Sequence, residues 1–228
     1  MADQRIEAVI FDLDGTLIDS EPVYLKAERK LLAEYGIHDF DESVKRQYIG
    51  MSTREMMERM VEKYGIRESI DVLIEKKNHY YIAIAKEHTY VFPEMRKFME
   101  LLMSYGYSLS LASGSSRIVL DNLLPSVGLA HYFDVILSAD QVPRGKPAPD
   151  LFYEAAHRLG VKAQNCLVVE DSGYGIEAAK KASMFCMAVH WRKDLPIPHN
   201  IRDADVAFIE GVTNFDARNA FDWVLARR

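Results

Sequence analysis

The sequence has few of the residues that would indicate a disulfide-stabilised or thiolate-metal protein. Only two cysteines, Cys166 and Cys186, occur among 228 residues, and no Cys-x-x-Cys or Cys/His ligand spacing is present. Both stand in apolar runs, "NCLVVE" and "FCMAV". We therefore expect two buried, reduced thiols and no disulfide framework or zinc site.

Long apolar runs and an excess of basic charge are also missing. No apolar stretch approaches the roughly 20 residues that a membrane-spanning helix requires. The opening "MADQRIEAVIF" lacks the basic-then-apolar pattern of a secretory leader. The formal net charge is -6, which disfavours nucleic acid as a partner. We expect a cytoplasmic protein, a monomer or weak oligomer, that binds neither nucleic acid nor membranes.

What the sequence does contain is a regular alternation of two patterns. After residue 92, amphipathic segments alternate with short apolar runs such as "YSLSLAS", "DVILSA", "NCLVVED", "FCMAVHW" and "ADVAFIE". A similar run, "EAVIFDL", begins the chain. Strands that alternate with helices indicate an α/β fold whose parallel sheet is covered on both faces.

The segment between the first two apolar runs has helical periodicity only. Three stretches, "SEPVYLKAERKLLAEYG", "STREMMERMVEKYG" and "SIDVLIEKKNHYYIAIAKEH", begin at Ser or Thr caps, and the first two end at glycine. We predict a helical cap domain over residues 19–91. It is inserted into a core domain made of residues 1–18 and 92–228.

Polar residues follow four of the predicted strands. In parallel sheets the carboxyl ends of neighbouring strands meet at one edge, where ligands bind. The residues delivered to this edge are Asp12, Asp14, Thr16, Ser113, Gly114, Ser115, Ser116, Lys146, Glu170 and Asp171.

Several carboxylates at one edge repel one another unless a cation lies among them. Mg²⁺ suits a few carboxylates together with water and phosphate oxygens, and it neutralises charge on a transferred phosphoryl group. Asp12 could then attack phosphorus, and Asp14 could handle the proton of the leaving group. Lys146 and Ser113 could hold phosphate oxygens.

Four motifs, in order, resemble those of the haloacid dehalogenase superfamily: "DLDGT", the serine of "LASGSS", "GKPAPD" and "VVEDSGYGIEAA". The similarity covers the whole chain and is closest to the branch of β-phosphoglucomutase-like enzymes and sugar-phosphate phosphatases. It implies a Rossmann-like core with a helical cap. It also implies Asp12 as nucleophile and Asp14 as general acid/base.

The same resemblance implies the ligand sets. Ser113, Gly114, Ser115 and Lys146 hold the phosphate, while Ser115 and Ser116 could equally cap a helix. Mg²⁺ is held by Asp12, the backbone carbonyl of Asp14, Glu170 and Asp171. The substrate candidates on the cap are Glu21, Tyr24, Arg54 and Lys77.

Two departures from the β-phosphoglucomutase pattern favour hydrolysis. Tyr24 stands where that pattern has a histidine associated with keeping water from the phosphoryl-enzyme, and the loop before Arg54 is one residue longer. We therefore expect a phosphatase acting on a small phosphorylated metabolite, most simply a sugar phosphate. A β-phosphoglucomutase-type isomerase and a phosphoglycolate or pyrophosphate hydrolase remain alternatives.

Other classes fit less well. A calcium loop needs Gly at its sixth position and Glu at its twelfth, whereas here Gly15 is fourth and Val23 twelfth. "RGKPAP" lacks the earlier glycine and the final Ser or Thr of a nucleotide-binding phosphate loop. A non-enzymatic phosphate-binding module would have lost the nucleophile or the metal acids, and neither is lost.

Overall fold

The computed structural model describes residues 5–48, 53–192, 195–209 and 215–228. The chain forms two compact units. The core unit comprises Met1–Asp19 and Tyr90–Arg228, and the cap unit comprises Ser20–Thr89.

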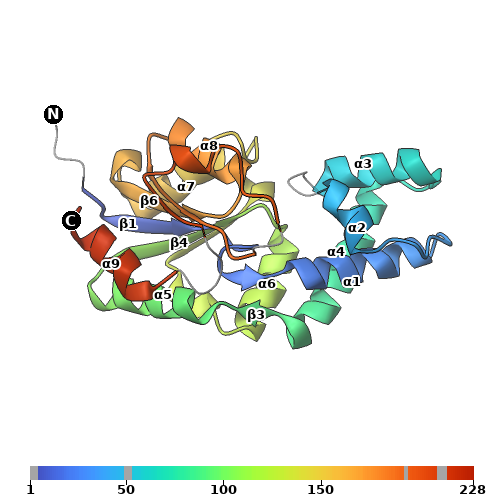
Figure 1. Cartoon of the computed structure of the whole chain (residues 1–228), viewed down its shortest axis with the longest axis horizontal. Helices are drawn as coiled ribbons and strands as arrows, with labels where there is room; N and C mark the ends of the chain where they lie inside the picture. Colours follow the sequence, from blue (N-terminus) through green and yellow to red (C-terminus); the bar gives the residue numbers. More distant parts are fainter. Residues whose placement is uncertain (1–4, 49–52, 193–194, 210–214) are drawn as a thin grey trace. The chain divides into compact units, whose positions relative to one another are not determined.

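A parallel six-stranded sheet lies at the centre of the core unit, in the order β5-β4-β1-β6-β7-β8. Figure 1 labels three of its strands, β1, β4 and β6. Every neighbouring pair is parallel. The strands are β1 (Ala8–Phe11), β4 (Ser108–Ser113), β5 (Val135–Ser138), β6 (Cys166–Glu170), β7 (Phe185–Val189) and β8 (Val206–Phe208).

Helices cover both faces of this sheet. The helices of the core unit are α5 (Pro93–Ser104), α6 (Arg117–Ser126), α7 (Asp150–Leu159), α8 (Gly173–Lys181) and α9 (Ala217–Leu225). Helices α7 and α8 lie on one face, and α5 and α9 pack together on the other (Figure 1). All residues of β1 and β6 are buried because both faces are covered. This confirms the predicted α/β fold.

Short 3₁₀ helices complete the connections: Arg46–Tyr48, Ala130–Tyr132, Ala139–Gln141, Ala163–Asn165 and Ile201–Asp203. Both cysteines are free and buried, as predicted. Within the described ranges, no helix combines the length and the apolarity needed to cross a bilayer.

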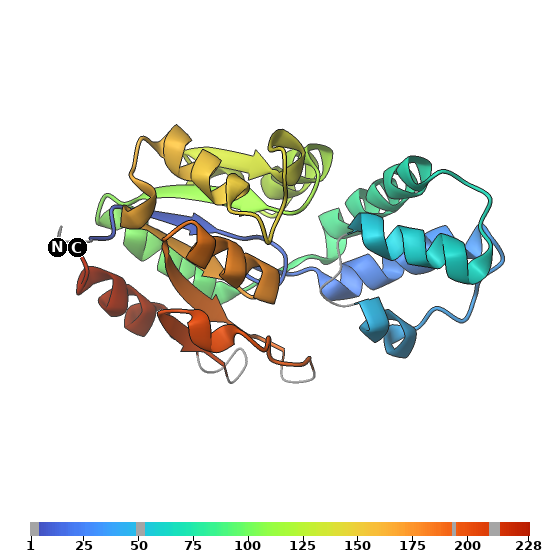
Figure 2. The same cartoon turned by 90° about the horizontal axis from the view of Figure 1, so that it is seen from above.

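The cap unit is all-helical. Its helices are α1 (Glu21–Ala33), α2 (Glu42–Lys45), α3 (Thr53–Tyr64) and α4 (Ile70–His88), and α4 packs against both α1 and α3 (Figure 2). Ser69 caps the N-terminus of helix α4, and its side chain accepts from the N–H of Val72. The apolar stripes of these helices meet in a core that includes Leu31, Met60 and Leu73.

Three features were not predicted from the sequence. A small antiparallel pair, β2 (Ile18–Asp19) with β3 (Tyr90–Val91), joins the segments where the chain leaves and re-enters the core unit. The others are α2 and α9. Strands of two residues and the four-residue α2 are too short to show a period. Helix α9 has nine residues, so this reason does not apply to it.

Candidate active site

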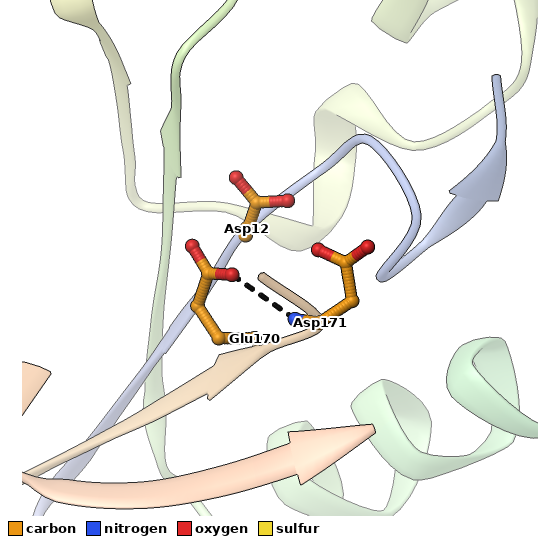
Figure 3. A group of neighbouring side chains, drawn as sticks. All are labelled: Asp12, Glu170 and Asp171. Atoms are coloured by element: carbon orange, nitrogen blue, oxygen red, sulfur yellow. Dashed lines mark hydrogen bonds between the residues drawn. The ribbon is translucent and has the colours of Figure 1, made fainter. Parts of the chain in front are cut away.

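Three carboxylates gather where strands β1 and β6 end. Asp12 directly follows β1, Glu170 is the last residue of β6, and Asp171 follows it (Figure 3). One oxygen from each lies within 4.8 Å of one from each of the others. Asp12 is 6% exposed and Glu170 is fully buried, so these charges are removed from most of the solvent. Oxygen ligands at this spacing suit a hard divalent cation.

Lys146 reaches these acids from the loop after β5. Its Nζ lies 2.6 Å from Asp12 Oδ1 and 2.6 Å from Glu170 Oε1, and it also donates to the carbonyl of Ala112 at 3.0 Å. An ammonium group has three donors, so all three are used by protein oxygens. Burial lowers the pKa of Lys146, but the charges of Asp12 and Glu170 outweigh burial and hold this pKa above its ordinary value.

One lysine does not neutralise this group of acids. Burial raises the pKa of Asp12 to about 7, the charges of Glu170 and Asp14 add to the rise, and Lys146 opposes it. Burial also raises the pKa of Asp171 well above its ordinary value, together with the charges of Glu170 and Asp12. A carboxyl group that keeps its proton near neutral pH has too little positive charge around it to stabilise the carboxylate. A bound cation would supply that charge.

Two glycines make the close approach of these acids possible. Gly15 has φ +80°, and a Cβ there would lie 2.1 Å from Asp171 Oδ2. Gly175, in the first turn of α8, lies so close to Glu170 that a Cβ would meet its carboxyl carbon at 1.9 Å. Any other residue at either position would push a carboxylate out of the cluster.

The start of α8 fixes the Glu170 side chain. Its Oε2 accepts from the N–H groups of Asp171 and Ser172, both at 3.0 Å, and from the Ser172 hydroxyl at 2.9 Å. The first of these bonds is the dashed line in Figure 3. Ser172 also caps the helix, because its Oγ accepts from the N–H of Gly175 at 3.0 Å.

Asp14 and the serines after β4 lie together. The hydroxyl of Ser115 donates to Asp14 Oδ2 at 2.7 Å. The N–H of Ser115 donates to Ser113 Oγ at 3.0 Å, and Ser138 Oγ donates to the Ser115 carbonyl at 2.8 Å. Asp12 and Asp14 therefore have different partners: a lysine for the first and a hydroxyl for the second.

The predicted cap residues divide into two groups. Lys77 is buried and lies over the ring of Tyr24, 4.7 Å from its centroid. Arg54 instead forms an ion pair with Asp71 in which both side chains are more than half exposed. Ser52 and the loop residues 49–51 lie outside the described residues.

Some residues of the site were missed by sequence reasoning. The roles of Ser172 and Gly175 depend on where the Glu170 side chain lies. Both residues follow Glu170 within five positions, in "EDSGYG", and this closeness in sequence could have indicated a contact. Ser138 gave no signal because its partner Ser115 is 23 positions away.

Comparison with known proteins agrees with this geometry. A family model described as haloacid dehalogenase-like hydrolase matches residues 9–189. The chain belongs to the haloacid dehalogenase-like hydrolase family. A phosphorylated carbohydrates phosphatase of Thermotoga maritima is 34% identical over 183 residues, 78% of this chain and 82% of that protein. A phosphoglycolate phosphatase of Neisseria gonorrhoeae is 35% identical over 190 residues, 82% of this chain and 80% of that protein.

A solved structure from Clostridium difficile, a β-phosphoglucomutase, has a TM-score of 0.75 at 28% identity, covering 97% of this chain and 100% of that chain. The family resemblance and the fold class predicted from the sequence are thereby confirmed. In this haloacid dehalogenase-like hydrolase, the acidic cluster lies within the residues that the family model matches.

Proposed function

We propose that this chain is a Mg²⁺-dependent phosphatase that hydrolyses a small phosphorylated metabolite, a sugar phosphate, through an aspartyl-phosphate intermediate. The observation that carries the proposal is the group of Asp12, Glu170 and Asp171 at the carboxyl edge of the sheet, in which Lys146 bridges Asp12 and Glu170. The names of the two phosphatase relatives support the reaction class.

In the first step, a carboxylate oxygen of Asp12 attacks phosphorus and the bond from phosphorus to the leaving oxygen breaks. Asp14 gives its proton to that oxygen, so an alcohol departs. The Ser115 hydroxyl, 2.7 Å from Asp14 Oδ2, positions the acid for this transfer.

In the second step, water attacks phosphorus of the aspartyl phosphate. Asp14, now a carboxylate, accepts a proton from this water, and the bond from phosphorus to Asp12 breaks. Inorganic phosphate leaves and both aspartates return to their starting states, so atoms and protons balance.

The residues that would hold Mg²⁺ are Asp12, Glu170 and Asp171 with the backbone carbonyl of Asp14. The ion would neutralise charge on the phosphoryl oxygens during transfer. Their buried oxygens and the raised pKa values of Asp12 and Asp171 fit such a cation.

Ser113, Gly114, Ser115 and Lys146 are proposed to hold the transferred phosphate. The Ser113 hydroxyl accepts from a backbone N–H, and its own hydrogen remains a donor for a phosphate oxygen. A phosphate oxygen at Lys146 would compete with Asp12 Oδ1 and Glu170 Oε1 for its hydrogens. A cytoplasmic location is also part of this proposal.

Phosphate release from a panel of phosphorylated metabolites, with Mg²⁺ and with a chelator, tests the proposal. Asp12→Asn should lower kcat by about 1,000-fold or more, roughly 4 kcal/mol of barrier, because the amide is not a nucleophile. Appreciable Mg²⁺-dependent turnover by the folded variant would contradict the assignment of Asp12.

A β-phosphoglucomutase-type isomerase is the second candidate, supported by the similarity to the Clostridium difficile structure. The protein should be incubated with β-glucose 1-phosphate, a hexose bisphosphate primer and Mg²⁺. Phosphate release supports hydrolysis, and glucose 6-phosphate formed without net phosphate release supports the mutase. Tyr24, stacked on Tyr81 with ring centroids 4.2 Å apart, favours hydrolysis because it replaces the expected histidine.

A further inference from the structure

A groove lies between helices α1 and α4 of the cap unit, and we call it the cap groove. Its volume is about 470 Å³, which falls within the ~300–1,000 Å³ typical of small-molecule sites. Every residue that lines it belongs to the cap unit. These residues are Lys26, Arg29 and Lys30 of α1 and Ala83, Ile84, Glu87 and His88 of α4.

The basic residues of the cap groove are accessible to solvent. Lys26 and Lys30 are each two positions from Glu28. With ~3.6 residues per turn, residues two positions apart project to nearly opposite sides of a helix. Glu28 is 3% exposed, whereas Lys26, Arg29 and Lys30 are exposed. The groove is therefore separate from the buried core of the cap unit, and its charged groups can meet a ligand from solution.

The cap groove holds an excess of positive charge. Its three basic side chains are accompanied by one carboxylate, that of Glu87, which leaves a net charge of +2 with His88 neutral. Within the part of the chain that the structure describes, no carboxylate lies within ion-pair distance of Lys26, Arg29 or Lys30. The whole chain, by contrast, has a formal net charge of -6. Positive charge is therefore concentrated here against the overall sign of the protein.

The acid best placed to neutralise Lys30 is engaged elsewhere. Glu34 follows Lys30 by four positions, a spacing at which opposite charges on a helix can pair. Instead, Glu34 accepts from Lys76 Nζ at 2.8 Å and from the Tyr80 hydroxyl. Lys30 Nζ lies over the ring of Tyr80, 5.6 Å from its centroid. The ammonium group of Lys30 thus has an aromatic neighbour and no neutralising acid.

The stability of α1 does not explain these cations. Lys26 and Lys30 are four positions apart, and like charges at this spacing destabilise a helix. The helix dipole favours a cation in the last turn, where Lys30 lies, but Lys26 and Arg29 precede that turn. A bound anion would offset the repulsion among the three groups, which favours a ligand over a structural role.

The arrangement of the groove indicates which anion fits. Side chains three and four positions apart on a helix have Cβ atoms about 5–6 Å apart, so a ligand with several neighbouring charges can contact all three cations at once. The planar guanidinium of Arg29 can donate two parallel hydrogen bonds to one phosphate, and the lysines act as point charges. Ala83 and Ile84 add apolar surface that suits an uncharged part of the same molecule.

We infer that the cap groove binds a small polyphosphate, meaning a ligand with two or more adjacent phosphate groups. A single phosphate would leave part of the positive charge unpaired. Nucleic acid extends far beyond a groove of this size and would meet the negative charge of the rest of the chain. This inference goes beyond the proposed phosphatase function, because no residue of the cap groove is among those assigned to the reaction.

Calorimetric titration of the metal-free protein with inorganic tripolyphosphate tests the inference. Metal is removed by dialysis and no chelator is present, because a chelator is itself a polyanion; without Mg²⁺ the proposed hydrolysis does not consume the probe. We expect one site that binds tripolyphosphate ~10–100-fold more tightly than inorganic phosphate, the range for one added hydrogen bond between charged groups. Raising the ionic strength to about 1 M, where the Debye length is ~3 Å, should remove most of this binding.

Two variants of the groove follow from its charges. Lys26→Gln/Arg29→Gln/Lys30→Gln should weaken tripolyphosphate binding by ~10–100-fold or more, because the charged donors are lost. Ala83→Glu places a second carboxylate in the groove at an exposed position and keeps all three cations. It should weaken binding as well, and it decides the question if the triple variant fails to fold.

A matched control removes the same amount of charge from exposed positions elsewhere in the cap unit: Arg59→Gln/Lys63→Gln/Arg67→Gln. Its affinity for tripolyphosphate should stay within about twofold of that of the unmodified protein, because salt screens exposed charges that do not touch the ligand. An equal loss of affinity in the control and in the groove variants would overturn the inference. Citrate that binds as tightly as tripolyphosphate would also overturn it, since citrate carries carboxylates only.

A nucleoside triphosphate distinguishes two sources of a polyphosphate. Tighter binding than that of tripolyphosphate supports an organic ligand that also contacts Ala83 and Ile84, and equal affinity supports an inorganic chain. An unmodified protein that binds neither probe overturns the inference. That result leaves the proposed phosphatase function intact, because phosphate release with Mg²⁺ tests that function separately.

Discussion

Gly15 illustrates how a single residue can be required twice, once for its backbone and once for its missing side chain. Its φ of +80° belongs to the left-handed region, and Asp171 Oδ2 occupies the space that a Cβ would take. Gly106 also has φ +80° in the core unit, but no atom lies within 4 Å of its ideal Cβ. Substituting each glycine therefore distinguishes two effects: backbone strain, which both positions share, and crowding by a neighbouring side chain, which occurs only at Gly15.

Gly15→Ala should therefore cost more than Gly106→Ala. Backbone strain contributes ~1–3 kcal/mol at either position, and only Gly15→Ala must also displace Asp171. We expect the Gly15 variant to bind Mg²⁺ about 10–100-fold more weakly, the range seen when a supporting contact of a metal ligand is lost. Urea unfolding and Mg²⁺ titration measure the two effects. Equal Mg²⁺ affinity in both variants would refute the crowding argument.

Asp14 gives a second prediction at this scale. Asp14→Ala removes the proposed proton donor, so turnover of alkyl phosphates should fall by ~100–10,000-fold. An aryl phosphate, whose leaving group needs little protonation, should still phosphorylate Asp12. A burst of p-nitrophenol without matching phosphate release would reveal this, whereas identical losses on both substrate types would rule out the acid role.

At the scale of secondary-structure elements, the start of α8 serves both folding and the site. Ser172 caps the helix and donates to Glu170, while Gly175 in the first turn leaves room for the carboxylate. The loop after β5 also supplies a residue of the site, Lys146. Each element delivers one group to the same edge of the sheet.

Ser172→Ala should lower the free energy of unfolding by ~1 kcal/mol through the lost cap. It should also weaken Mg²⁺ binding, because Glu170 loses one of its three Oε2 donors. Ser69→Ala is the matched control: Ser69 caps α4 by accepting from Val72 at 3.3 Å, on a helix of the cap unit. The control should lose comparable stability and keep its Mg²⁺ affinity; a parallel loss of affinity in both would contradict the role of Ser172.

At the scale of the whole molecule, the raised carboxyl pKa values of the acidic cluster make folding depend on pH. The pKa of Asp12 is about 7 in the folded protein, against an ordinary value of 3.8. When the pKa of a carboxyl group is higher in the folded than in the unfolded protein, the group contributes its full stability at pH values below the pKa of the unfolded chain. That contribution disappears as pH rises from about 4 to 7. Without metal, the fold should therefore lose this contribution by neutral pH.

The proposed Mg²⁺ would displace the protons that Asp12 and Asp171 hold, so its binding should tighten as pH rises. We expect a larger increase in Tm on adding Mg²⁺ at pH 8 than at pH 6. Calorimetry in buffers of different ionisation enthalpy should detect proton release at pH 6. A Tm increase that is the same at both pH values would contradict the assigned protonation of the cluster.

Much of the fold could be read from local patterns. Apolar runs such as "NCLVVED" are recognisable because a strand buried on both faces needs an unbroken series of apolar residues. The four strand-end motifs could also be recognised, because the residues of each motif are contiguous in the sequence. The pair β2–β3 was not, because two residues carry no period.

By itself, then, the sequence determined the α/β class, the family and the acids that line the sheet edge, all of which depend on neighbours along the chain. Only the tertiary structure decided that Lys146 bonds to Asp12 and Glu170, that Gly175 faces Glu170, and that Lys45 pairs with Glu28 and faces the ring of Tyr24. These contacts join residues on separate elements, and the distance between such residues is set by packing and not by any pattern within either segment.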